Sequence, residues 1–130
     1  MARGHRSQIK RARNEQTKLN KKPVAHARYV RVSPIKAKYV LDLIRGKDVK
    51  TAMAILLYTP TKSARVIAKV LKSAMANAEN NKGMEVEALF VETAIANQGP
   101  SMKRIRPRAQ GRAFRIEKKT SHMTIELGTK

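Results

Sequence analysis

The chain has 130 residues, enough for one domain but too few for a second compact one. It contains 29 Lys and Arg against 9 Asp and Glu, and its formal net charge of +20 excludes a typical soluble enzyme and indicates a polyanionic partner. Cysteine is absent, which excludes disulfides, thiolate chemistry and Cys-ligated zinc, and no cofactor or metal is expected. Neither an apolar run near the ~18 residues of a membrane span nor a secretory signal is found. The composition predicts a cytoplasmic protein associated with nucleic acid.

The positive charge is concentrated in two segments. Residues 1–31 hold ten Lys and Arg against one Glu, and residues 97–123 hold eight against one Glu. The first 22 residues contain few large apolar side chains, so burial would not offset the entropy of ordering them. We therefore expect residues 1–22 to form a basic N-terminal extension that is disordered when free, and residues 23–130 to form a single globular domain.

The first predicted element of this domain is a strand over residues 25–32, AHARYVRV, which is rich in β-formers. Ser33 is a good helix N-cap, and Pro34 suits the first helical position, where its missing N–H is harmless. A helix is therefore predicted from Pro34 to just before Gly46, a residue typical of helix C-termini.

Two further helices are predicted before Gly83. Asp48 can cap the first, which ends near Tyr58, and the second opens at Thr59-Pro60 or at Thr61 and runs to about Asn80. Apolar residues in the second recur at spacings of three and four, which is typical of an amphipathic helix. These residues are Ala64, Ile67, Ala68, Leu71, Met75 and Ala78.

After Gly83 the apolar period changes to two, which indicates strands that are buried on one face. The first such run places on one face Leu89, Val91, Thr93 and Ile95. The second alternates with polar residues and consists of Met123, Ile125 and Leu127. The predicted fold class is α+β, with three helices packed on a small antiparallel three-stranded sheet.

The last two predicted strands are separated by a basic segment, residues 98–121, which is far longer than the roughly two to five residues of a tight hairpin. Gly111, near its centre, can adopt the positive φ of a turn. Arginines recur at period two on the outgoing arm, as on one face of a strand, at Arg104, Arg106 and Arg108. We therefore predict a long extended β-hairpin that projects from the domain and is not fully paired at Pro107, which lacks a donor.

The predicted hairpin is too long for the small core to cover. At ~3.3 Å per residue, arms of about 11 residues reach roughly 35 Å. Because Arg can hold phosphate oxygens at two points and Lys supplies a point charge, its eight cations suit a crevice lined by phosphates. This hairpin is the predicted functional element.

A resemblance to a known family covers most of residues 25–127. The hairpin and last strand read GPSMKRIRPRAQGRAFRIEKKTSHMTIEL, the first strand and helix read RYVRVSPIKAKYVLDLIRGK, and the third helix contains KVLKSAMANAENN. These strings resemble the L twenty-two family of large ribosomal subunit proteins, of the bacterial type.

The resemblance implies a compact RNA-binding domain at the outer face of the large subunit, with a hairpin that reaches inward and lines the nascent polypeptide exit tunnel. It implies a structural constituent of the ribosome, not an enzyme, which binds several domains of 23S rRNA and supports subunit assembly. The implied partners also include neighbouring large-subunit proteins and, at the hairpin tip, the nascent polypeptide. Neither a membrane nor a second copy of the chain is an expected partner.

Charge and resemblance together select the candidate site residues. RNA-binding candidates in the domain are Arg28, Arg31, Lys36, Lys38, Arg45, Lys47 and His122. RNA-binding candidates on the hairpin are Ser101, Lys103, Arg104, Arg106, Arg108, Arg112, Arg115, Lys118 and Lys119. The resemblance places at the tunnel wall Met102, Lys103, Arg104, Arg108, Gln110, Gly111 and Arg112.

Three other classes of function were weighed. The charge permits a general nucleic-acid or nucleoid DNA-binding protein, but neither helix-turn-helix spacing nor a basic zipper is found. An enzyme is disfavoured because His5, His26 and His122 show no metal-ligand spacing and no neighbouring carboxylate. A membrane-surface protein is disfavoured because the apolar stripe of the third helix is needed for the core.

Overall fold

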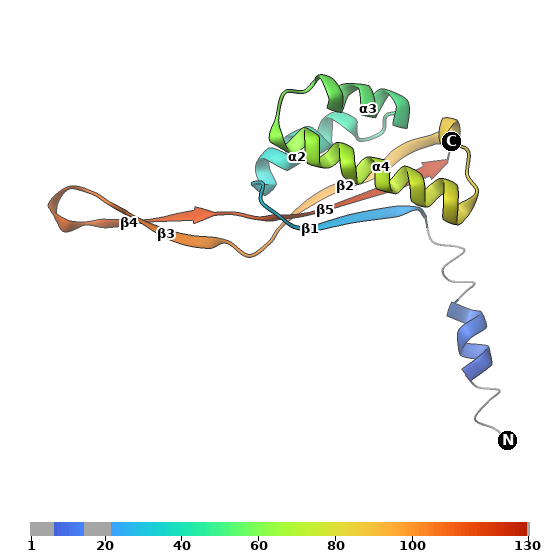
Figure 1. Ribbon diagram of the computed structural model, residues 1–130, viewed down its shortest axis with the longest axis horizontal. Coiled ribbons are helices and arrows are strands. Elements are labelled where there is room, and N and C mark those ends of the chain that lie inside the picture. Colours follow the sequence, from blue (N-terminus) through green and yellow to red (C-terminus); the bar gives the residue numbers. More distant parts are fainter. Residues whose placement is uncertain (1–6, 15–21, 130) are drawn as a thin grey trace.

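The computed structural model describes residues 7–14 and 22–129 (Figure 1). Two short 3₁₀ turns, Val86–Ala88 and Ala109–Gly111, accompany the main elements of the domain. These elements are β1 (Val24–Val30), α2 (Pro34–Ile44), α3 (Val49–Tyr58), α4 (Lys62–Lys82), β2 (Leu89–Gln98), β3 (Met102–Pro107), β4 (Ala113–Lys118) and β5 (Ser121–Thr129).

The strands form two separate antiparallel sheets. One has three strands in the order β1-β5-β2, and the other is the two-stranded ribbon β3-β4. Figure 1 shows α2, α3 and α4 together on one side of the three-stranded sheet, with the β3-β4 ribbon projecting from the end of that sheet. The predicted α+β class with antiparallel sheets is confirmed.

The number of helices differs from the prediction. Residues 7–14 form a further helix whose residues are all exposed, so the described residues contain four helices instead of three. This helix was not predicted because it is exposed: a helix that buries no apolar face shows no apolar periodicity in the sequence. The remaining residues of the basic extension, 1–6 and 15–21, lie outside the described residues, and its disorder when free stays a prediction.

The helix ends follow local chemistry in most places. Thr61 caps α4, and its hydroxyl accepts a hydrogen bond from the Ala64 amide at 3.2 Å. Gly46, just after α2, and Gly83, at the end of α4, adopt left-handed φ values of 76° and 60°. Ser33 precedes α2 as predicted, but its side chain makes no capping hydrogen bond.

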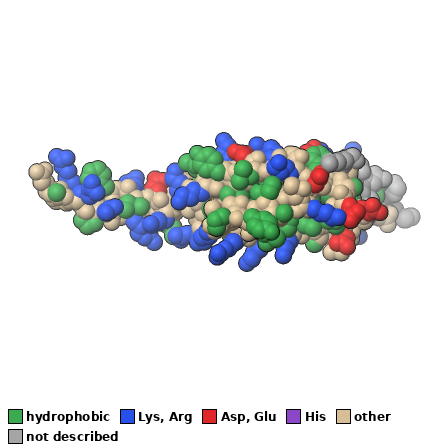
Figure 2. All heavy atoms as spheres, turned by 90° about the horizontal axis from the view of Figure 1, so that it is seen from above, with side chains coloured by type: hydrophobic (Ala, Val, Ile, Leu, Met, Phe, Trp, Pro, Cys, Tyr) green, Lys and Arg blue, Asp and Glu red, His purple; other side chains and the backbone are tan. Residues whose placement is uncertain are grey.

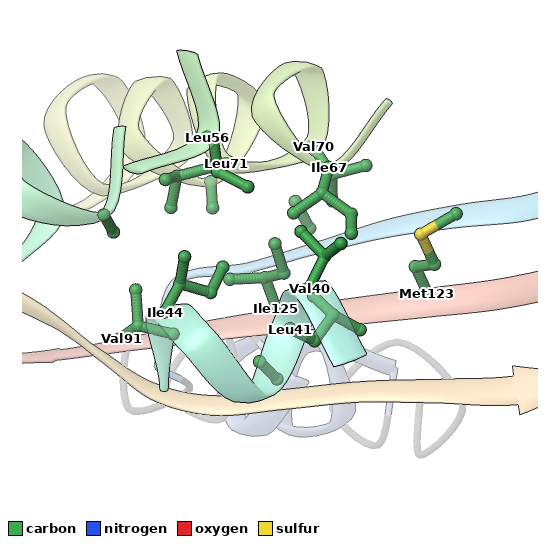
Figure 3. Packing of buried hydrophobic residues seen from close by; sticks show 14 of the residues in the cluster. Val40, Leu41, Ile44, Leu56, Ile67, Val70, Leu71, Val91, Met123 and Ile125 are labelled. Atoms are coloured by element: carbon green, nitrogen blue, oxygen red, sulfur yellow. The ribbon is translucent and has the colours of Figure 1, made fainter. Parts of the chain in front are cut away.

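The core lies between the helices and one face of the three-stranded sheet (Figure 3). The helices contribute large fully buried side chains such as Leu41, Ile67 and Leu71, and β5 contributes Met123, Ile125 and Leu127, each 0% exposed. The alternation predicted for β5 is therefore confirmed. No residue of β3 or β4 belongs to the core cluster, so the domain folds around apolar contacts that the ribbon does not provide.

One prediction for β2 is wrong. Leu89 and Val91 are buried as expected, but the next buried residue is Ala94, and Ile95 is 45% exposed. The pairing of β2 with β5 shifts by one residue between Val91 and Thr93. Because side chains alternate between faces, one extra residue moves every later side chain to the opposite face.

None of the helices in the described part of the chain combines the length and apolar content that a membrane span needs.

Candidate nucleic-acid interface

The β3-β4 ribbon sorts its side chains by strand register. Met102 pairs with Lys118, Arg104 with Ile116 and Arg106 with Phe114, so these six residues share one face. The opposite face consists of Lys103, Ile105, Pro107, Ala113, Arg115 and Glu117. The predicted shared face is confirmed for Arg104 and Arg106, whereas Arg108 follows the end of β3 and lies at the turn. Both faces are cationic, so the ribbon can contact polyanions on two sides.

The cations of the ribbon form no ion pair within the described residues, although Glu117 lies across the ribbon from Lys103. Every residue from Met102 to Arg115 is exposed. Within residues 22–129, the ion pairs are Lys22–Glu92, Arg45–Asp42 at 3.0 Å and Lys50–Glu87 at 2.7 Å, and none involves a hairpin cation. The hairpin cations therefore retain their charge for an external partner.

The tip of the ribbon is a tight turn. Gln110 and Gly111 both adopt left-handed backbone, with φ values of 60° and 68°. The Arg108 amide donates to the Arg112 carbonyl at 2.8 Å and closes the turn. The Arg108 guanidinium also lies 5.7 Å from the centre of the Phe114 ring, within the range of a cation–π contact.

The root of the ribbon is joined to the domain by three contacts. The Gly99 amide donates to the Thr120 carbonyl at 2.9 Å, and the buried Thr120 hydroxyl donates to the Pro100 carbonyl at 2.6 Å. The guanidinium of Arg31 donates to the sulfur of Met102 at 2.9 Å. These contacts fix where the ribbon leaves the sheet.

The candidate cations of the domain are not equivalent. Arg28, Lys36, Lys38 and Lys47 are exposed and make no side-chain ion pair within the described residues. Arg45 differs, because one nitrogen of its guanidinium donates to the Ala94 carbonyl at 2.6 Å while another pairs with Asp42. Arg45 therefore has a structural role, because its contacts link α2 to β2.

His122, another candidate, is half-buried and contacts the protein itself. Its Nδ1 accepts a hydrogen bond from the Tyr29 amide at 3.0 Å. Ser101 is also half-buried, at the root of the ribbon. The structure thus gives His122 a supporting contact within the fold.

A hollow of about 600 Å³ lies beside the start of α2 and α4. Three cations, Arg31, Lys36 and Lys62, line it together with the ring of Tyr39. The positive ends of the helix dipoles of α2 and α4 favour negative charge there. Lys62 was not among the RNA-binding candidates selected from the sequence, because only the fold brings it close to Arg31 and Lys36.

The charge is distributed unevenly over the surface. Figure 2 shows Lys and Arg side chains along the ribbon and along the adjoining part of the domain, whereas most Asp and Glu visible in that view gather at the end far from the ribbon tip. The described residues contain no group of three or more His, Asp or Glu that could hold a metal ion. The Lys and Arg along the ribbon suit it to contact an extended polyanion.

Gly99, Thr120 and Tyr29 are further residues of the interface that sequence reasoning missed. The first two form the root of the ribbon, and Tyr29 lies beside it. Their contacts join positions at least 20 residues apart, so no local motif marks them. The two arms of a hairpin must meet at one pair of residues at its base. This requirement is the only signal in the sequence that could have indicated Gly99 and Thr120.

An α+β domain that presents a cationic two-stranded ribbon outside its core belongs to the class of nucleic-acid-binding proteins that dock an extended arm. Comparison with protein families agrees: the family described as Ribosomal protein L22p/L17e matches residues 25–128. The chain belongs to this family of ribosomal proteins, and it is not an enzyme.

Individual relatives extend the match to nearly the whole chain. The chain is 58% identical to "Large ribosomal subunit protein uL22" of Lachnoclostridium phytofermentans over 127 residues, which is 98% of both chains. It is 56% identical to the protein of the same name from Lachnospira eligens, again over 98% of both. A third relative of that name, from Clostridium novyi, is 59% identical over 101 residues, covering 78% of this chain and 91% of the relative.

Proposed function

We propose that this chain is a structural constituent of the large ribosomal subunit, that it binds 23S rRNA, and that its hairpin lines the nascent polypeptide exit tunnel. The observation on which this depends is the ribbon: its eight Lys and Arg are exposed or half-exposed, lie outside the core and have no carboxylate partner within the described residues. Family membership supplies the ribosomal setting.

Binding is electrostatic first and geometric second. Each Lys or Arg that neutralises a phosphate releases condensed counterions, which favours association in a salt-dependent way. The ribbon adds shape, because a narrow two-stranded arm with cations on both faces can occupy a crevice between RNA segments and contact both walls. An arm that joins several RNA segments in this way would also support subunit assembly.

The tunnel-lining role falls on the ribbon tip and the arm that leads to it. Two consecutive left-handed residues, Gln110 and Gly111, make the turn compact, and a compact tip leaves room for a passing chain. Arg108 and Arg112 flank the turn and hold it closed through their backbones. Met102, Lys103 and Arg104 complete the proposed tunnel surface along β3.

A sedimentation assay tests the assignment. Ribosomes from cells that express the tagged chain are pelleted, washed at about 1 M salt and separated into subunits, because the Debye length of ~3 Å at that ionic strength releases loosely held surface cations. We expect the chain to stay with the large subunit. Complete release, with recovery on bulk DNA or free RNA, would contradict the proposal and support a general nucleic-acid-binding protein.

A variant in which a short turn replaces residues 101–119 provides the matched control. Because no residue of β3 or β4 belongs to the core cluster, the shortened chain should fold. It is expected to leave the large subunit during the same wash. Retention equal to that of the full chain would show that the ribbon is not the binding element.

Charge variants test the mechanism. Arg104→Gln/Arg106→Gln removes two charges from the ribbon, and Lys69→Gln/Lys72→Gln removes two from the exposed side of α4. The slope of log affinity for 23S rRNA against log salt should fall by roughly 1.4–1.8 for the ribbon pair, at about 0.7–0.9 per phosphate contact, and by less for the α4 pair. Equal slopes for both pairs would indicate non-specific attraction.

A further inference from the structure

Tyr29 has an unusual backbone near the end of the edge strand β1. Its φ of 56° is left-handed, and Tyr29 and Gln110 are the non-glycine residues with positive φ in the described part of the chain. For a bulky residue this conformation is a strained outlier. Such strain persists only where surrounding contacts hold it, and it is typical of functional positions.

A bulge in the sheet explains how the strain arises. Ala27 of β1 pairs with Met123 of β5, and Val30 pairs with Ser121, so two residues of β1 lie opposite the single residue His122. Bulges that contain a left-handed residue, as this one does at Tyr29, usually have glycine there, because glycine adopts that backbone most easily. The sheet would therefore form at lower conformational cost with glycine at position 29 than with tyrosine.

His122 holds both the backbone and the ring of Tyr29. The Tyr29 amide donates to His122 Nδ1 at 3.0 Å. The two rings meet edge to face, with centroids 4.7 Å apart and an interplanar angle of 89°. In an edge-to-face pair His122 covers at most one face of the phenol ring.

Burial does not explain the tyrosine. Tyr29 is 66% exposed and lies outside the core cluster. Tyr39 and Tyr58 are also exposed, but both are on helices with ordinary backbone. Tyr29 therefore combines a strained backbone with an exposed aromatic ring that a specific neighbour holds.

The position of Tyr29 indicates the ligand. Arg28 precedes it and is exposed, and Arg31, which contacts Met102 at the root of the ribbon, follows two residues later. Cations that attract phosphates thus flank an aromatic face on which a base can stack. RNA bases that leave a helix are commonly bound on aromatic side chains in this way.

We propose that Tyr29 is a stacking site for one unpaired base of ribosomal RNA at the root of the hairpin, and that His122 is the residue that positions it. This inference rests on the proposed binding of 23S rRNA. It assigns to His122 a role through Tyr29 instead of direct RNA contact. It also assigns base recognition to one ring, alongside the phosphate contacts of the ribbon.

The test compares side chains that differ in one property. Tyr29→Phe keeps the aromatic face, whereas Tyr29→Leu keeps the strained backbone and apolar bulk but has no aromatic face. Tyr29→Gly removes the ring and also relieves the backbone strain. Tyr58→Ala, at an 89% exposed ring on α3, is the control. Affinity for a full-length 23S rRNA transcript is measured by filter binding over a series of salt concentrations.

We expect Tyr29→Phe and Tyr58→Ala to bind within twofold of the unmodified chain. Tyr29→Leu and Tyr29→Gly should bind roughly 5- to 150-fold more weakly, the range for loss of one stacked base. The salt slope should be unchanged, because no phosphate contact is lost. The melting temperature of Tyr29→Gly should not fall below that of the unmodified chain.

Three results would overturn the proposal. Binding of Tyr29→Leu within twofold of Tyr29→Phe would exclude stacking. A smaller salt slope in Tyr29→Leu would show that the ring only keeps Arg28 and Arg31 in place. If the unmodified chain itself fails to prefer 23S rRNA over an equal mass of duplex DNA, the proposed function fails and this inference falls with it.

Discussion

The root of the ribbon offers a substitution whose effect can be worked out from contacts. Gly99 is not in left-handed backbone, so alanine is compatible with its main chain. A Cβ at position 99, however, would lie 2.6 Å from Thr120 Oγ1 and 3.1 Å from His122 Nε2. Contacts this short force the Thr120 side chain to move.

Three contributions determine the size of the effect of Gly99→Ala. Crowding in a well-packed site costs roughly 1–3 kcal/mol. Displacing the buried Thr120 hydroxyl weakens its hydrogen bond to the Pro100 carbonyl, at about 1 kcal/mol. The lower conformational entropy of alanine in the unfolded chain offsets about 0.4–1 kcal/mol. The free energy of unfolding should therefore fall by about 1–3.5 kcal/mol.

A double-mutant cycle separates crowding from other effects. Urea unfolding is followed for Gly99→Ala, Thr120→Ala and the double variant. Thr120→Ala alone should cost about 0.5–1.5 kcal/mol, because it removes the hydrogen bond to Pro100. In the double variant the closest clashing atom is gone, so its loss should be smaller than the sum of the single losses by about 1–2 kcal/mol.

Two outcomes would refute this reasoning. Additive losses would show that the alanine methyl and the Thr120 hydroxyl do not compete for the same space. A Gly99→Ala variant with a free energy of unfolding within about 0.5 kcal/mol of the unmodified chain would show that the root is loosely packed.

Two further predictions concern the domain. Thr61→Ala should lower the free energy of unfolding by about 1 kcal/mol, because the Ala64 amide loses its cap. Ser33→Ala should lower it by less, because Ser33 makes no capping hydrogen bond. Urea unfolding of the two variants measures both effects. The hydrogen bond and positive charge of Lys50 lower the pKa of Glu87, so their pairing favours the folded state at neutral pH and this contribution is lost as pH falls through the lowered pKa. Lys50→Met should return the Glu87 pKa to its ordinary range in an NMR titration, and an unchanged pKa would contradict the assigned cause.

Local chemistry made much of the fold predictable. Gly46 and Gly83 end their helices in left-handed backbone, as expected of glycine, and Met123 and Ile125 alternate inward because a strand has a period of two. The hairpin was predictable as well, because residues 98–121 are too long and too basic for a tight turn.

Tertiary effects account for what the sequence did not reveal. The bulge near Glu92 that turns Ile95 outward depends on how β2 meets β5, and nothing in the strand itself marks it. Ser33 is of a residue type that favours the N-cap position, but its side chain makes no capping hydrogen bond. Cap geometry depends on the path of the chain that leads into the helix. The left-handed Tyr29 arises from a mismatch between β1 and β5 of one residue, and non-glycine residues adopt that backbone too rarely to be predicted.

The separation of core and ribbon has a consequence for how the interface works. An isolated two-stranded ribbon is marginal in water, and in this one Arg104 and Arg106 lie on the same face without a carboxylate partner. Their repulsion opposes ordering of the ribbon, and the root contacts at Gly99 and Thr120 act only at one end. Phosphates along the arm would remove that repulsion, so a polyanion bound by the ribbon would also stabilise its extended shape. The domain core contains none of these residues, so its stability does not depend on a bound polyanion.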